Sequence, residues 1–166
     1  MKTTIKPVKE QDTVKIVAQL AEEIWNEHYV PIIGQEQVDY MVEKYQSVPA
    51  ISHQIEEEGY TYYLVYAGEE AVGYLGVQTR EQDLFLSKYY MHSSQRGKGY
   101  GKEALEFIRQ YAREHQLQGI SLTVNKYNSN SIAAYEKMGF LNLGPTVADI
   151  GNGFIMDDYI MRLPLS

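Results

Sequence analysis

The spacing of apolar side chains is helical over the first third of the chain. Between residues 12 and 59 they recur at every third or fourth position, as at Ile16, Leu20 and Ile24, which places them on one face of a helix. Pro31 and Gly34 interrupt this pattern. The pattern predicts a helix over about 12–29 capped by Asp12, a second over 35–46, and a short third helix from Pro49 to Gly59.

The period changes to two after Tyr60, which is typical of strands. The predicted strands are 3–8, 60–67, 71–79, 84–91, 120–125, 140–150 and 154–163. Two further helices, over about 100–116 and 129–138, lie between the later strands, and Gly139 is placed to end the second one. The sequence has no repeat, low-complexity tract or linker. This order indicates one mixed α/β (α+β) domain over residues 1–166.

The composition narrows the classes of function. The chain has 44% hydrophobic residues and a net charge of −7, so we expect neither nucleic acid nor an anionic membrane as a partner. It has no cysteine, which excludes disulfides, an acyl-cysteine intermediate and thiolate metal sites. The first residues lack the apolar segment of a signal peptide, and no apolar run approaches the length of a membrane span. We therefore expect a cytoplasmic protein.

A glycine-rich turn follows the strand predicted at 84–91. Gly97, Gly99 and Gly101 lead into the helix that begins near residue 100. Glycine lets a ligand approach the main-chain amides closely, and the start of a helix presents unpaired N–H groups with a partial positive charge. The cations beside this turn are Arg96, Lys98 and Lys102. The turn therefore predicts an anion site suited to phosphate.

Two common nucleotide motifs do not fit this turn. A P-loop needs four residues before its Gly-Lys pair and then Ser or Thr, but only three residues separate Gly97 from Gly101, and Glu103 follows Lys102. A Rossmann fingerprint needs glycine at relative position six, where this chain has Lys102.

Two sequence blocks resemble the GNAT family of N-acetyltransferases. Arg96-x-x-Gly99-x-Gly101 matches the family's Gln/Arg-x-x-Gly-x-Gly/Ala signature. The segment from Asn125 through Asn128 and Tyr135 to Gly139-Phe140 is similar to the family's second block, at the correct distance from the first. The resemblance covers nearly the whole chain, and the N-terminal half more loosely resembles PaiA-like polyamine N-acetyltransferases.

The resemblance implies a fold and a cosubstrate. The expected fold is a central, mostly antiparallel sheet of about seven strands, flanked by helices, with a splay after the fourth strand. The expected cosubstrate is acetyl-CoA, with no metal. The residues that the resemblance places on acetyl-CoA are Tyr89, Tyr90, Met91, Arg96, Gly97, Lys98, Gly99, Tyr100, Gly101, Lys102 and Asn128. Among them, the main chain at Met91 faces the thioester carbonyl, and the turn binds the pyrophosphate.

Tyr135 matches the family's general acid. A phenol of pKa about 10 is protonated at neutral pH and can donate to a departing thiolate. The alternative is a core tyrosine that packs with Ile132 and Met138. Asn128 has a similar alternative, because it could cap the helix over 129–138.

The general base is not identified by the resemblance. Relatives carry glutamate on the central strand or on the next one, where this chain has Leu84-Phe85-Leu86-Ser87-Lys88 and Thr123. Ordered water and four side chains stay open as alternatives. Those side chains are Glu27, His28, Tyr29 and His92.

The resemblance implies direct transfer of acetyl to a primary amine of a small molecule, with a polyamine as one option. Two other interpretations stay open: acetylation of a protein N-terminus or an amino acid, and a coenzyme-A-binding sensor without turnover. The 15 tyrosines and the habit of the family also allow a homodimer.

Overall fold

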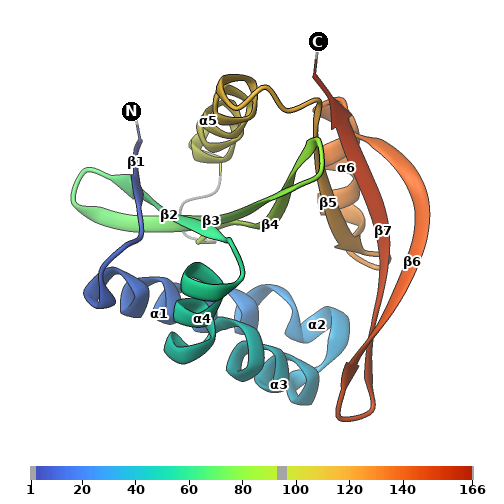
Figure 1. Cartoon of the computed structure of the whole chain (residues 1–166). Helices are drawn as coiled ribbons and strands as arrows, with labels where there is room; N and C mark the ends of the chain where they lie inside the picture. The colour runs from blue at the N-terminus through green and yellow to red at the C-terminus, as the bar shows by residue number, and fades with distance from the viewer. Residues whose placement is uncertain (1–2, 93–96, 166) are drawn as a thin grey trace. The chain divides into compact units, whose positions relative to one another are not determined.

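The computed structural model describes residues 3–92 and 97–165. Within them the chain forms a seven-stranded sheet in the order β1-β2-β3-β4-β5-β7-β6, flanked by helices (Figure 1). The helices are α1 (Gln11–His28), α2 (Val30–Ile33), α3 (Gln35–Gln46), α4 (Val48–Glu57), α5 (Tyr100–Glu114) and α6 (Ser129–Lys137). The strands are β1 (Thr4–Pro7), β2 (Thr61–Ala67), β3 (Glu70–Arg80), β4 (Asp83–Met91), β5 (Gly119–Asn125), β6 (Leu141–Gly151) and β7 (Phe154–Pro164).

The sheet confirms the predicted fold class. β1 pairs with β2, β2 with β3, and β7 with both β5 and β6, all antiparallel. β4 and β5 form a parallel pair, but its register runs only from Asp83↔Gly119 to Phe85↔Ser121. Because β4 continues to Met91 beyond this pairing, the structure also has the predicted splay after the fourth strand.

The chain divides into two compact units. The first consists of Met1–Gln78 and Lys88–Ile108, and the second of Thr79–Ser87 and Arg109–Ser166. β4 therefore begins in the second unit and ends in the first. That residues 1–166 act as one domain stays a prediction.

One local prediction failed at the start of α1. Asp12 is not the cap of α1, because the helix begins one residue earlier and its N-cap is Glu10, whose amide donates to Thr13 Oγ1 (3.2 Å). Pro31 interrupts the helical pattern between α1 and α3, as predicted. It lies in the first turn of the short helix α2, where proline loses no helical hydrogen bond, and Gly34 (φ 88°) ends that helix.

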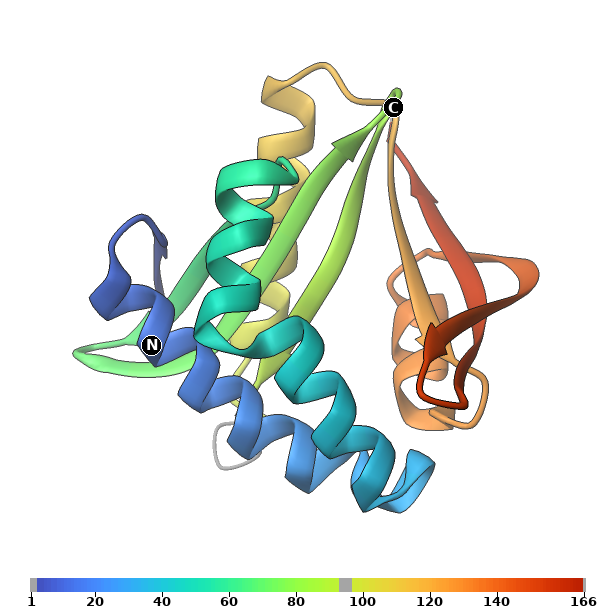
Figure 2. The ribbon, with the colours of Figure 1, turned by 60° about the horizontal axis from the view of Figure 1, so that its bottom comes forward.

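In the first unit, α1 packs against both α3 and α4 (Figure 2). These helices cover one face of β1–β3, and the first half of α5 lies on the other face, where Phe107 contacts Tyr63. The buried positions of α1 follow the helical period and place Val17, Ala21 and Ile24 in the core.

A chain of hydrogen bonds runs through this core. Trp25 Nε1 donates to the Tyr74 hydroxyl (3.1 Å), which donates to Gln46 Oε1 (2.6 Å). Gln46 Nε2 donates to the Tyr62 hydroxyl (3.1 Å), and that hydroxyl donates to Gln54 Oε1 (2.6 Å). Burial raises the pKa of Tyr62 and the pKa of Tyr74, so both phenols stay protonated donors. The chain thus joins α1, α3 and α4 to β2 and β3. We name it the buried polar chain.

In the second unit, β6 and β7 form a long hairpin whose turn is Gly151-Asn152-Gly153, with positive φ at all three residues. Gly139, two residues after α6, lies against the face of β7 that carries Leu163, because a Cβ there would lie 3.2 Å from Leu163 Cδ1. Arg109 donates to the carbonyl of Met138 (3.3 Å) at the end of α6, where a cation is favourable.

Tyr74→Phe should lower the free energy of unfolding by about 2–4 kcal/mol. The change leaves the indole N–H of Trp25 and the amide oxygen of Gln46 buried without their partner. Denaturant unfolding measures the loss. The matched control is Tyr66→Phe on β2, whose ring contact with Lys6 survives the change. Equal stability of the two variants would contradict an essential role of the buried polar chain.

Candidate active site

The glycine-rich turn has the conformation that its sequence requires. Gly97 (φ 78°) and Gly99 (φ 81°) both lie in the left-handed region, where other residues are strained. A Cβ at either position would meet no atom within 4 Å, so the space beside the turn is open. The first helical bond of α5 runs from Glu103 N to Gly99 O (3.2 Å), so the amides that precede it lie outside the helical ladder. Lys98 and Lys102 are exposed beside them, and Arg96 lies outside the described residues.

Tyr89 fixes this turn to β4. Its hydroxyl donates to the carbonyl of Gly101, and a Cβ at Gly101 would lie 3.1 Å from that hydroxyl. Burial raises the pKa of Tyr89 to about 12, which keeps the donor protonated. The side chain of Tyr89 therefore positions the start of α5. That its main chain binds the cosubstrate stays a prediction.

Tyr90 joins the end of β4 to the end of α1. Its hydroxyl lies 3.0 Å from the hydroxyl of Tyr29, and its ring packs edge-on against Trp25 at 5.8 Å between centroids. Met91, the last residue of β4, approaches β3 at Gly73, where any Cβ would collide with the Tyr90 carbonyl and the Met91 sulfur. Glycine at residue 73 is thus required by this close approach.

The proposed bases of the first unit form contacts of their own. His92 Nε2 lies 3.4 Å from Glu23 Oε2 on α1, and the His92 amide donates to Val72 (2.7 Å). The ring of His28 packs edge-on against Tyr29. Glu27 is exposed on α1. The structure therefore brings Tyr29 and Tyr90 together, and none of the four proposed bases, all of them described, is buried.

In the second unit, α6 carries the two residues of the second block. Asn128 is 4% exposed and caps the helix, because its Oδ1 accepts from Ser131 N (3.4 Å). The capping alternative is thus confirmed for Asn128, and its contact with acetyl-CoA stays a prediction. Tyr135 is half-buried, and its ring packs on Phe140 at 5.5 Å between centroids. Its role as the acid also stays a prediction.

Asp158 on β7 is a carboxylate that the sequence interpretation missed. It is 5% exposed, and burial, followed by the charge of Asp157, raises its pKa to about 6. The alternating pattern of β7 could have identified Asp158, because its side chain shares a face of the strand with Met156 and Ile160. An acidic residue at an apolar position of a strand indicates a special environment.

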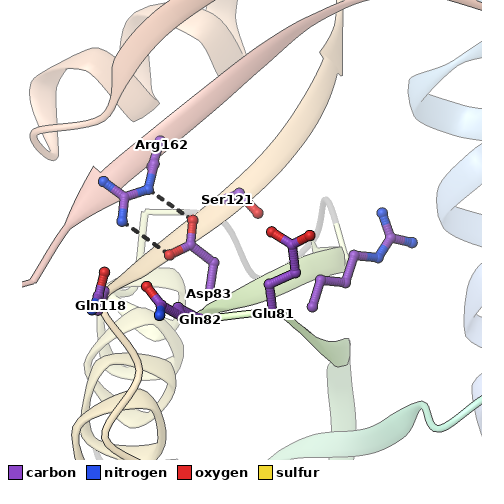
Figure 3. Close-up of a pocket in the computed structure, with 7 residues that line it drawn as sticks. Glu81, Gln82, Asp83, Gln118, Ser121 and Arg162 are labelled. Atoms are coloured by element: carbon purple, nitrogen blue, oxygen red, sulfur yellow. Dashed lines mark hydrogen bonds and ion pairs between the residues drawn. The ribbon is translucent and has the colours of Figure 1, made fainter.

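A polar cavity of about 580 Å³ lies in the second unit at the beginnings of β4 and β5 (Figure 3). Arg162 Nε and Nη2 donate to the two oxygens of Asp83 (2.7 and 2.9 Å), as the dashed lines show. Hydrogen bonding to Arg162 lowers the pKa of Asp83. Gly119 leaves room for this guanidinium, because a Cβ there would lie 2.5 Å from Arg162 Nη2. The ion pair between Asp83 and Arg162 therefore links β4 to β7 across β5.

Two further findings concern the described residues only. None of their helices is long and apolar enough to cross a membrane. They also contain no group of three or more His, Asp or Glu side chains arranged to hold a metal ion.

Asp158→Asn should change how stability depends on pH. The folded pKa of about 6 lies above the ordinary value of 3.8, so the folded state holds a proton that the unfolded state has released. Wild-type stability therefore falls as pH rises from about 4 through 6, and the variant lacks this loss. The stability of the variant relative to wild type should rise by about 2 kcal/mol between pH 4.5 and pH 8. Urea unfolding of both proteins at the two pH values measures their free energies of unfolding. The same difference between variant and wild type at both pH values would contradict the prediction.

Comparison with known proteins places this geometry in a family. The family model described as Acetyltransferase (GNAT) family matches residues 18–140. The uncharacterized N-acetyltransferase YycN of Bacillus subtilis (strain 168) is 32% identical over 76 residues, which are 43% of this chain. The match spans about half of that relative, 49% of its length.

Solved structures share the fold over the whole chain. The PaiA N-acetyltransferase of Thermoplasma acidophilum, in complex with coenzyme A, has a TM-score of 0.80 at 18% identity, covering 99% of this chain and 100% of that one. The spermidine/spermine N-acetyltransferase SpeG of Vibrio cholerae, in mutant forms, has a TM-score of 0.67 at 18% identity, covering 98% and 95%. Because the family model matches well over half of the residues, the chain belongs to the acetyltransferase (GNAT) family of acyltransferases.

Proposed function

We propose that this protein transfers acetyl from acetyl-CoA directly to the primary amine of a small molecule, in a ternary complex. The observation that carries the proposal is the turn between β4 and α5. Gly97 and Gly99 hold positive φ, the space beside them is open, and the start of α5 follows at once. An open turn at the start of a helix is suited to an anion such as the pyrophosphate of coenzyme A.

The residues of the turn fit coenzyme A by their chemistry. Main-chain amides and the partial positive charge of a helix start favour an anion, and Lys98 and Lys102 add charge. Arg96, outside the described residues, belongs to the same predicted set. The main chain at Met91 would donate to the thioester carbonyl and stabilise the oxyanion. Asn128 would contact the pantetheine or phosphate arm.

Tyr135 would supply the last proton. When the bond between the acetyl carbon and sulfur breaks, the phenol donates to the thiolate, which leaves as a thiol. The absence of cysteine means that no acyl-enzyme on sulfur intervenes. Transfer therefore runs from one bound substrate to the other.

A small cationic amine is the acceptor class that we favour, with polyamines first. The net charge of −7 attracts cations, and SpeG, with the same fold, is a spermidine/spermine N-acetyltransferase. We also retain the homodimer and the cytoplasmic location as predictions.

The direct test is a turnover screen. The purified protein is incubated with acetyl-CoA and a panel of polyamines, monoamines, amino acids and short peptides, while free thiol is followed. We expect amine-dependent thiol release, largest with a small amine. Release only with peptides would move the acceptor to a protein N-terminus. Thermal stabilisation by acetyl-CoA without release from any amine would favour the sensor.

Gly99→Asp should weaken acetyl-CoA binding by about a hundredfold or more, which is about 2.7 kcal/mol. The new side chain is strained at φ 81° and places a negative charge beside the phosphates. Calorimetric titration measures the affinity. Gly68→Asp, at φ 65° in the β2–β3 turn and equally open, is the matched control for strain alone. Full binding by the Gly99 variant would refute this position of the site.

Tyr135→Phe should lower kcat by about ten- to a thousandfold with little change in acetyl-CoA affinity. The change removes the hydroxyl and keeps the ring that packs on Phe140. Steady-state rates across pH, with the binding constant, measure both effects. A rate unchanged at every pH would remove the acid role.

A further inference from the structure

Asp158 is a buried carboxylate without a partner. It is 5% exposed, and its carboxylate makes no hydrogen bond or ion pair with any residue in the described ranges 3–92 and 97–165, although its main chain is paired in the sheet. Its neighbour Asp157, on the other face of β7, lies 2.8 Å from Lys126 Nζ. Because buried charges in proteins are normally paired, the unpaired one calls for a cation from outside the chain.

The strands beside Asp158 supply no such cation. Across β5 it lies opposite Asn125, and across β6 opposite Thr146. The next residue of the same face on β5 is Thr123, and Arg162 on β7 is held by Asp83. Asp157, on the opposite face, is the charged group that acts on Asp158, and its charge is negative.

The position of Asp158 is tied to α6, which carries the proposed acid Tyr135. Asn125 ends β5, and the segment that follows is fixed by two main-chain bonds: Lys126 N donates to Asp157 O (3.1 Å), and Asn128 N donates to Asn125 O (3.0 Å). Gly139, just after α6, lies against the face of β7 that carries Leu163. Asp158 projects from the opposite face, because residues of odd and even number alternate along the strand.

Beyond Ser121, the residues of β5 have no register partner on β4 in the described part of the chain. Asp158 thus pairs with Asn125 at the C-terminal end of β5, where that strand has no register partner on β4, and α6 with Tyr135 is the next helix of the chain. A carboxylate at this strand end and a tyrosine on the next helix suit a reaction in which the incoming amine loses a proton and the leaving thiolate gains one.

We propose that Asp158 is the general base that deprotonates the acceptor amine; the assignment rests on the proposed function. Its carboxylate takes one proton from the ammonium group, and the neutral nitrogen attacks the thioester carbonyl. The carbon–nitrogen bond forms and the carbon–sulfur bond breaks. Tyr135 gives its proton to sulfur and regains one from the new amide nitrogen. Asp158 then releases its proton to solvent, so one proton leaves per turnover.

The raised pKa of Asp158, about 6, supports this role. The group is ionised at neutral pH and can accept a proton. Compared with a carboxylate at the ordinary 3.8, its protonated form is about a hundredfold more populated when it competes with the same ammonium. Burial without a neighbouring cation thus raises the pKa of a carboxylate and makes it a stronger base.

The test compares Asp158→Asn with Asp157→Asn, its neighbour on the other face. Thiol release is measured from pH 5 to pH 9 with the best amine, and acetyl-CoA affinity is measured by calorimetry. We expect wild-type kcat to fall below about pH 6. Asp158→Asn should lower kcat by about a hundred- to a thousandfold, lack this acidic limb, and bind acetyl-CoA as wild type does. Asp157→Asn should keep the limb and shift it to lower pH.

Asp158→Glu adds a rescue, because it restores a carboxyl and should return part of the rate and an acidic limb. Asp158→Asn with unchanged kcat and an intact limb would overturn the proposal. A raised KM alone, or an equal loss of acetyl-CoA binding, would overturn it too, because the residue would then bind or support structure. If none of the amines in the panel makes the wild-type protein release thiol, the proposed function fails before any variant is compared.

Discussion

The buried polar chain is the constraint on which the first unit depends. Apolar packing alone would let α1, α3 and α4 slide on the sheet, because such contacts have little directional preference. The hydrogen bonds from Trp25 through Tyr74 and Gln46 to Tyr62 do depend on direction. Each of these four residues belongs to a different helix or strand. The amide of Gln46 accepts on its oxygen and donates from its nitrogen, so a rotated amide would break both contacts. One register of the helices on the sheet is therefore selected.

That register places the end of α1 at the end of β4. Trp25, within the polar chain, also packs on Tyr29, and Tyr29 meets Tyr90. One residue earlier, Tyr89 holds the start of α5 through Gly101. The alternation of β4 thus sends Tyr90 toward the helices of one face and Tyr89 toward the turn on the other. Adjacent residues connect the two faces of the first unit to one strand.

Periodicity predicted most elements to within a residue or two, because each of them buries one regular face. The glycines of the turn were predictable as well, since Gly97 and Gly99 have the positive φ that only glycine adopts easily. The polar chain was not predictable, because Gln46 and Gln54 read as polar helix positions and become buried only through the hydroxyls of distant strands. Asp158 was missed for a related reason: the two aspartates at 157 and 158 look alike in sequence, and only strand pairing gives one a lysine and leaves the other buried.

The unpaired carboxylate on β7 also bears on how this protein can be improved by selection. A library screened for thermal tolerance alone at neutral pH would favour replacements of Asp158, because a neutral side chain removes the cost of a buried charge. Such clones would be robust and, on the assignment made above, slow. A campaign that seeks both properties should hold residue 158 fixed and take its gains from the exposed apolar positions of the β6–β7 hairpin, such as Val147 and Ile155.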